Sequence, residues 1–421
     1  MHKKTIFKNK ARLLYIPTPG TEAVTVLFLF AVGSRYETPE INGVSHFIEH
    51  LMFKGTKKRP TTLHISKELD GVGAEFNAFT GKDYTGYYIK INHKQVDLAV
   101  DVLSDMLLNS KFDAKEMNRE RGVIIEEINM YHDNPIMYIE NVCEDSIYFG
   151  STLGWDIAGP VETIRKVTRK QLLEYKNKFY QPNNVVVAVA GKIDTKVKGI
   201  IQKKFANLFK QRAKPEIFEP FVFDQKAPRI KIKYRDTKQV QLGLGFGAFG
   251  YGDKRTHAMH LLTIILGGNM SSRLFISVRE RRGLAYFVRC YPNFYQDVGN
   301  IFIQSGLDVS RLDSAIKVIL DELKKIKKGV TAKELKDAKE FVRGKMVLNL
   351  EDSSHVAEYF AKQELLMNEI STPDQKMKLY DKVTTKEVRA VANEIFKKER
   401  LNLALIGPFR DAKKFHKLIS L

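Results

Sequence analysis

The sequence predicts an α+β protein of two domains, and three observations lead to this prediction. The two halves of the chain begin alike, because residues 24–37 and 240–253 each combine an alternating apolar strand pattern, a glycine-bearing turn and a polar stretch. An apolar helical pattern that ends in glycine follows each of them, at residues 43–55 and 256–268. Between the two repeats, residues 212–229 contain three prolines, which is typical of a linker.

The domain boundaries follow from this linker. A chain of 421 residues with 43% hydrophobic content can form two or three domains with large cores. We expect one domain at residues 1–211 and a second of similar fold at residues 230–421. The similar beginnings indicate an internal duplication.

The first apolar element runs from Ala23 to Val32, which is too short to span a bilayer and typical of a buried strand. The preceding residues are basic and lack an apolar core of signal-peptide length. The chain has two cysteines, Cys143 and Cys290, in no CxxC motif, which suits a reducing compartment. We therefore expect a soluble, cytoplasmic protein without a membrane partner.

The next element carries the strongest chemical signal, the pentapeptide HFIEH at residues 46–50. His46 and His50 are one helical turn apart and project from the same face, so both can bind one cation. Glu49 lies beside them, where it can take a proton from a water molecule at the metal. This is the inverted form of the HExxH arrangement. On the pentapeptide alone, two ordinary surface or core histidines are an equal alternative.

A third metal ligand is expected on an acidic helix downstream. Asp113 can cap this helix with Glu116 in a capping box, and the helix ends near Pro135. Glu120 and Glu127 are two turns apart and share one face of it. The neighbouring positions Val123, Ile124 and Ile128 make part of this surface apolar, so carboxylates there would be costly without a cation.

The second half carries no such ligands. When the two helices are aligned on their closing glycines, the ligand positions of the first fall near Ala258, Leu261 and Leu262. The second half also contains a GxGxxG pattern at Gly245, Gly247 and Gly250, but these residues occupy the duplicated strand and no ribose-binding acid follows about 20 residues later. We therefore expect only the first half to bind a metal, and neither half to bind a dinucleotide.

The net charge of +20 permits a nucleic-acid binder as an alternative. The lysines are dispersed, however, and no known nucleic-acid-binding motif accompanies them. We expect a solvated basic surface and no specific nucleic-acid partner.

The motifs resemble the insulinase or pitrilysin family of zinc peptidases, in particular its half-length, processing-peptidase-like branch. The matching segments cover nearly the whole chain: NGVSHFIEHLMFKGT (42–56), GAEFNAFTGKDYT (73–85), ERGVIIEEINMYHDNP (120–135), LGWDIAGPVETI (153–164) and SSRLFISVRERRGLAY (271–286). The resemblance implies two homologous α/β-sandwich domains, each an antiparallel-rich sheet covered by helices, that together form half of a clamshell.

The resemblance also implies roles for single residues. His46, His50 and Glu127 would be the ligands of one Zn²⁺ per chain, Glu49 the general base, and Glu120 a carboxylate that orients the metal site. Arg279 and Tyr286 match the pair that holds the oxyanion in this family. Because this chain has both the zinc motif and the Arg/Tyr pair, the resemblance implies an active homodimer.

Three further residues are implied to bind the substrate. Asn77 and Ala78 would pair with an extended peptide backbone, and Phe53 would line an apolar pocket for the residue after the cut. The acidic pair that reads arginine in mitochondrial processing peptidases would fall near Met137 and Asn141, and neither of these is acidic.

Taken together, these expectations describe a zinc-dependent endopeptidase that hydrolyses extended peptides inside a dimeric chamber. A non-catalytic assembly subunit of the same family is the alternative from another functional class.

Overall fold

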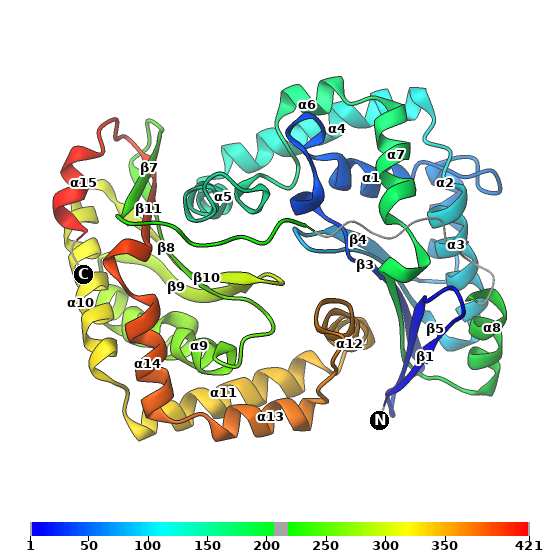
Figure 1. Cartoon of the computed structure of the whole chain (residues 1–421). Helices are drawn as coiled ribbons and strands as arrows, with labels where there is room; N and C mark the ends of the chain where they lie inside the picture. Colours follow the sequence, from blue (N-terminus) through cyan, green and yellow to red (C-terminus); the bar gives the residue numbers. More distant parts are fainter. Residues whose placement is uncertain (1, 206–217, 420–421) are drawn as a thin grey trace. The chain divides into compact units, whose positions relative to one another are not determined.

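The computed structural model describes residues 2–205 and 218–419, which form two compact units, each built around one sheet (Figure 1). Both units combine segments from the two halves of the chain. Unit 1 consists of Met1–Ile128, Asp156–Phe218 and Met346–Thr372, and unit 2 of Asn129–Trp155, Glu219–Lys345 and Pro373–Leu421. This division differs in content from the contiguous domains 1–211 and 230–421 expected from the sequence. Residues 212–217 of the expected linker lie outside the described residues.

Unit 1 contains a six-stranded sheet and the helices that cover it. Its strands are β1 (Lys3–Ile6), β2 (Arg12–Pro17), β3 (Ala23–Phe30), β4 (Glu75–Thr80), β5 (Thr85–Asn92) and β6 (Val185–Gly191). Its helices are α1 (Val44–Met52), α2 (Thr62–Asp70), α3 (Val96–Asn109), most of α4 (Ala114–Asp133), α6 (Val161–Lys166), α7 (Arg169–Phe179), α8 (Thr195–Phe205) and α12 (Ser353–Met367).

Unit 2 contains a five-stranded sheet. Its strands are β7 (Arg229–Tyr234), β8 (Gln239–Phe249), β9 (Ala285–Phe294), β10 (Val298–Asp308) and β11 (Leu401–Gly407). Its helices are α5 (Pro135–Ile147), α9 (Thr256–Thr263), α10 (Leu312–Lys328), most of α11 (Ala332–Asn349), α13 (Pro373–Lys382), α14 (Thr385–Ile395), α15 (Lys413–Leu418) and the π-helical segments η6 (Ile264–Gly268) and η7 (Phe275–Glu280).

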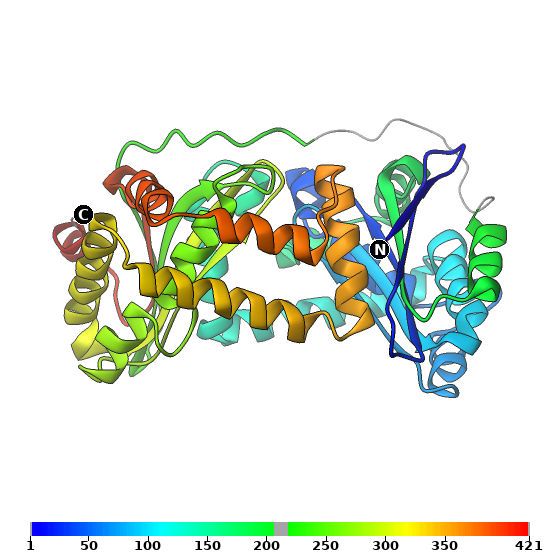
Figure 2. The same ribbon diagram turned by 90° about the horizontal axis from the view of Figure 1, so that it is seen from below.

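The strand expected at Ala23 to Val32 is β3, and it is buried on both faces. Alternate residues from Val24 to Phe30 belong to the core that the sheet shares with α1, α3 and α7. On the opposite face the hydroxyl of Thr25 lies 2.8 Å from that of Ser353, at the start of α12. Helix α12 packs along β3 and β6 (Figures 1 and 2). Helices on both faces explain why the strand reads as an unbroken apolar run.

The two sheets repeat one topology. The order is β1-β2-β6-β3-β5-β4 in unit 1 and β7-β11-β8-β10-β9 in unit 2. In each sheet one pair is parallel, β2 with β6 and β7 with β11, and the other pairs are antiparallel. Helix α5 packs on β8 and β11 of unit 2 as α12 packs on β3 and β6 of unit 1. This matching arrangement agrees with an internal duplication.

The glycines of the GxGxxG pattern lie on β8 or directly after it and serve packing. A side chain at Gly245 would lie 2.5 Å from the Ile147 side chain of α5, and one at Gly247 would lie 2.3 Å from Phe223. The glycines therefore let α5 and the segment that contains Phe223 approach the sheet closely.

The apolar helix expected at residues 256–268 is interrupted. Helix α9 ends at Thr263, and η6 continues to Gly268 with a wider π-helical turn. The counterparts of the metal-binding positions, Ala258, Leu261 and Leu262, are all buried and apolar. The second half thus has a core helix where the first has its histidines.

Candidate metal centre

Helix α1 is anchored by a buried carboxylate at its first turn. The backbone at Gly43 adopts a left-handed conformation, with φ +97°, that glycine tolerates best. Glu37, only 4% exposed, accepts hydrogen bonds from the backbone amides of Gly43 and Ser45, both at 2.7 Å, and from the Asn42 side chain at 2.8 Å. These bonds satisfy N–H groups that a helix start leaves open. Glu37 was not among the residues expected from the sequence.

Two histidines of α1 and a carboxylate of α4 come together in unit 1. The Nε2 atoms of His46 and His50 are 3.2 Å apart. Glu127 Oε2 lies 3.7 Å from His46 Nε2 and 3.4 Å from His50 Nε2. The structure therefore brings the three residues expected to bind zinc into one cluster.

The spacing of these atoms suits a tetrahedral ion. Nitrogen and oxygen ligands about 2.1 Å from a zinc ion lie about 3.4 Å from one another at tetrahedral angles. The three observed separations of 3.2, 3.4 and 3.7 Å are close to that edge length. Two imidazoles and one carboxylate are also the ligand set of a catalytic zinc site with one open position.

The charges around the histidines favour a cation. Burial lowers the pKa of His46 to about 4, so its imidazole is neutral and able to act as a ligand. Burial also acts to lower the pKa of His50, but hydrogen bonds to Glu120 and Glu127 outweigh it and raise this pKa to about 9. The carboxylates that favour a proton on His50 equally favour a divalent cation at the same position.

Glu49 points to a different partner from the other carboxylates of the site. Its Oε2 accepts a hydrogen bond of 2.5 Å from the hydroxyl of Thr80, the last residue of β4. Burial raises the pKa of Glu49, and the bond from Thr80 partly offsets this effect. A carboxylate with a raised pKa beside the ligand cluster is suited to proton transfer. Thr80 could not be predicted as a partner of Glu49 from the sequence, because the two residues are 31 positions apart.

Glu120 lies behind His50 and connects it to a lysine. Its Oε1 is 2.9 Å from His50 Nδ1, and its Oε2 is 2.7 Å from Lys54 Nζ. Burial would raise the pKa of Glu120, but these two bonds lower it, so the carboxylate is ionised although only 3% exposed. Lys54 was not among the expected site residues.

Helix α4 matches its expected bounds, with Asp113 accepting from the amides of Lys115 and Glu116. The carboxylate of Glu116 binds Arg119. Of the apolar positions beside the two glutamates, Ile124 and Ile128 are buried.

Val123, the third of these apolar positions, is 48% exposed.

The residues expected to bind substrate lie beside α1. Asn77 and Ala78 are on β4, which among the described strands pairs with β5 alone and so forms one edge of the sheet. Asn77 is exposed, and its side chain accepts a hydrogen bond from the Ala78 amide. Phe53 stacks on Phe76 of the same strand, with ring centroids 6.3 Å apart.

Arg279 and Tyr286 are neighbours within unit 2. Arg279 lies in η7, and its guanidinium is 5.7 Å from the centroid of the Tyr286 ring. Tyr286 is the second residue of β9, and 81% of its surface is exposed. Single π-helical turns are frequent at functional sites.

Glu140 and Glu144, the acidic residues nearest to Met137 and Asn141, bind partners within unit 2. Glu140 accepts from Tyr291 at 2.8 Å and from Asn293 at 2.7 Å. Glu144 accepts from Tyr295 and Asn300. These two carboxylates are thus engaged in holding α5 on the sheet.

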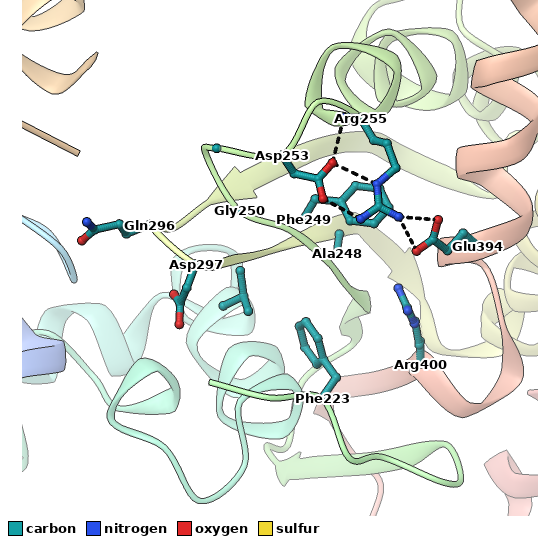
Figure 3. A pocket seen from close by; sticks show the side chains of 12 residues that line it. Phe223, Ala248, Phe249, Gly250, Asp253, Arg255, Gln296, Asp297, Glu394 and Arg400 are labelled. Atoms are coloured by element: carbon teal, nitrogen blue, oxygen red, sulfur yellow. Dashed lines mark hydrogen bonds and ion pairs between the residues drawn. The ribbon is translucent and has the colours of Figure 1, made fainter. Parts of the chain in front are cut away.

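A pocket of about 430 Å³ lies at the end of β8 in unit 2 (Figure 3). Its Arg255 binds the carboxylates of Asp253 and Glu394 and stacks on Phe249. A third carboxylate, Asp297, also lines the pocket. Arg400 lines the pocket as well, so two arginines stand beside the three carboxylates.

The comparisons with known proteins assign the family. The family model described as Insulinase (Peptidase family M16) matches residues 12–161, and the model described as Peptidase M16 inactive domain matches residues 166–342. The "zinc protease YmxG" of Bacillus subtilis is 35% identical over 409 residues, which cover 97% of this chain and 98% of the relative. The chain belongs to the insulinase family of peptidases.

Further known proteins are similar to nearly the whole chain. The zinc protease SCO5738 of Streptomyces coelicolor is 34% identical, covering 99% of this chain and 92% of the relative. The crystal structure of a protease from Helicobacter pylori superposes with a TM-score of 0.91 at 26% identity, over 97% of this chain and 99% of that one. A chain of complex III from Candida albicans has the same fold, with a TM-score of 0.86 at 16% identity and complete coverage of both chains.

These comparisons confirm the predicted family and the predicted α+β fold of two sheet-and-helix domains. At the level of the family, the chain is a metalloprotease whose relatives are named for zinc. Within the described parts of this insulinase-family chain, the helices are all too short or too polar to cross a membrane.

Proposed function

We propose that this protein is a zinc-dependent endopeptidase that cleaves extended peptides. The observation that carries the proposal is the cluster of His46, His50 and Glu127, whose ligand atoms have the separations of a tetrahedral site. When bound there, zinc would supply Lewis-acid activation of water and of the scissile carbonyl.

Glu49 would move the proton in this reaction. It lies one residue from His50 in the same helix, yet its carboxylate is held by Thr80 outside the ligand cluster. It would accept a proton from the attacking water and pass it to the leaving amine.

The exposed edge of β4 would hold the substrate. An extended peptide can add to such an edge through backbone hydrogen bonds, with Asn77 and Ala78 beside it. The stacked pair of Phe53 and Phe76 favours an apolar side chain next to the cleaved bond.

Arg279 and Tyr286 would stabilise the developing oxyanion, by the resemblance to the family. Because a chain of this length corresponds to half of the fused clamshell peptidases, we propose a homodimer in which these two residues serve the metal site of the partner subunit. Zinc site and Arg/Tyr pair would then meet across the dimer.

The proposal is tested by incubating the purified protein with a diverse peptide library and reading the cleavage sites by mass spectrometry. We expect cleavage by the wild type and none with a chelator or with Glu49→Gln, because that variant lacks the base but keeps all three ligands. His50→Ala should lose both zinc and activity. Glu126→Gln, an exposed carboxylate one position from Glu127, is the matched control and should cleave normally.

Wild-type turnover by Glu49→Gln would contradict the assignment of the base. A wild type that binds zinc but cleaves nothing would favour a non-catalytic assembly subunit.

A further inference from the structure

A chain of three charged or polar side chains begins at the proposed metal ligand His50 and continues through Glu120 to Lys54. His50 Nδ1 is 2.9 Å from Glu120 Oε1, and Glu120 Oε2 is 2.7 Å from Lys54 Nζ. With a metal ion bound at Nε2, which faces His46 and Glu127, the ring hydrogen of His50 would lie on Nδ1 and be donated to Glu120. Each oxygen of Glu120 thus has its own partner.

Glu120 depends on both partners, because it has little access to water. Its side chain is 3% exposed, and a buried carboxylate is costly unless it is paired and hydrogen-bonded. Without the lysine, Oε2 would lose its cationic partner while Oε1 still bound the imidazole. The carboxylate would then be free to rotate away from His50 toward water.

Lys54 is well placed to prevent this rotation. It follows α1 directly, and its backbone amide donates to Leu51 in the last turn of that helix at 3.1 Å. Its side chain is 23% exposed, so the ammonium lies at the margin of the buried site. The lysine therefore ties the helix that carries the histidines to the helix that carries Glu120 and Glu127.

The other histidine has no equivalent support. His46 Nδ1 is buried and has no hydrogen-bond partner among the described residues. The orientation of the imidazole pair accordingly depends on the contact between His50 and Glu120.

We propose that Lys54 is a positioning residue of the metal site, which acts through Glu120 to hold His50 in its binding orientation. This inference rests on the proposed function, because it assumes that His50 binds zinc. Second partners of metal ligands of this kind contribute about 10- to 100-fold to metal affinity, and Lys54 acts one group further out.

The experiment measures the dissociation constant of zinc by competition with a chromophoric chelator. For Lys54→Met we expect zinc binding about tenfold weaker than in the wild type, and for Lys54→Arg, which keeps the cation, binding within about threefold. The matched control is Lys57→Met, because Lys57 is exposed three positions further on and has no ion pair among the described residues. It should bind zinc as the wild type does.

A second pair of variants tests the path of the effect. In a Glu120→Gln background the carboxylate that Lys54 holds is gone, so adding Lys54→Met should change the zinc affinity by less than about twofold. Thermal unfolding of the metal-free variants tells loss of fold from loss of affinity. If Lys54→Met does not fold, Lys54→Ala replaces it, since it also removes the ammonium that binds Glu120, and the same loss of zinc affinity is expected.

Wild-type affinity in Lys54→Met, or an equal loss in the presence and absence of Glu120, would overturn the inference. A wild type that binds no zinc would instead overturn the proposed function, so the two failures are distinguishable.

Discussion

At the residue scale, three glutamates around the histidines of α1 have three different environments. Glu127 faces both Nε2 atoms, Glu120 binds the far side of the His50 ring, and Glu49 binds the hydroxyl of Thr80. These partners suit Glu127 to the proposed role of ligand, Glu120 to that of an orienting group and Glu49 to that of a base, although the three side chains are chemically identical. Environment and not residue type therefore distinguishes their proposed roles.

Thr80→Val should reduce turnover without loss of zinc. The substitution keeps the shape of the side chain but removes the hydroxyl that donates to Glu49, so the base loses its fixed orientation. We expect kcat to fall about 10- to 100-fold, and Thr80→Ser to recover most of it. Steady-state kinetics on a peptide that the wild type cleaves, with elemental analysis of each variant, measures both quantities. Unchanged kcat, or zinc lost in step with activity, would contradict the role of Thr80.

The sequence indicated the residues of the cluster and Glu120, but not the other residues around them. The spacing of His46 and His50 is a local property that a sequence displays, whereas Glu127 was assigned from the family resemblance. Thr80 and Glu37 act across turns and strands, so their contacts exist only once unit 1 has folded. Glu120 was expected beside the metal, whereas its partner Lys54 was not.

At the element scale, helix α1 begins at a buried carboxylate whose ionisation is linked to stability. Burial raises the pKa of Glu37 to about 7, despite hydrogen bonds from Asn42, Gly43 and Ser45 that favour the charged form. The folded protein therefore holds a proton at Glu37 over a range, between the ordinary value of 4.5 and about 7, in which the unfolded chain releases it. The stability from this group is complete below that range and is lost as the pH rises through it.

Comparison with Glu37→Gln should reveal this pH dependence. The glutamine does not titrate, so the free energy of unfolding of the wild type relative to the variant should fall by up to roughly 3 kcal/mol between about pH 4 and pH 8. Urea unfolding followed by circular dichroism at several pH values gives the difference, in which the other titrating groups cancel. A difference that stays constant or grows with pH would contradict the assignment.

Elements of the second half show why motif spacing alone misleads. The GxGxxG pattern on β8 is explained by the close approach of α5, a helix about 100 positions earlier in the chain. The helix after it changes to a π-helical turn at Ile264, which an apolar pattern does not reveal. Strand β3 and helices α1 and α4 could be predicted, because their patterns are long and bounded by caps or glycines.

At the scale of the whole molecule, the two units share a sheet topology, and each receives a helix from the other half of the chain. Helix α5 follows α4 in the sequence but packs in unit 2. Helix α12, from the second half of the chain, packs in unit 1. The duplication was visible in the sequence, since β3 and β8 begin alike. The exchange of helices between the two halves was not visible in the sequence, because the pattern of an amphipathic helix does not indicate which of two similar sheets it covers.

Mixed dimers should show whether the proposed active site is shared between subunits. Glu49→Gln subunits and subunits with both Arg279→Ala and Tyr286→Phe should each be inactive alone. After subunit exchange, a mixed dimer would contain one site with both defects and one with none, so activity should reappear. Mass spectrometry confirms the exchange. Exchanged dimers that stay inactive would contradict a shared site.

The zinc content of the reconstituted protein tests the central claim most directly. Two histidines and one glutamate leave a single open position, so elemental analysis should find about one zinc per chain in the wild type and in Glu49→Gln. His50→Ala, which removes a ligand, should retain almost none. A wild type with less than about a tenth of a zinc per chain after reconstitution would contradict the metallopeptidase account.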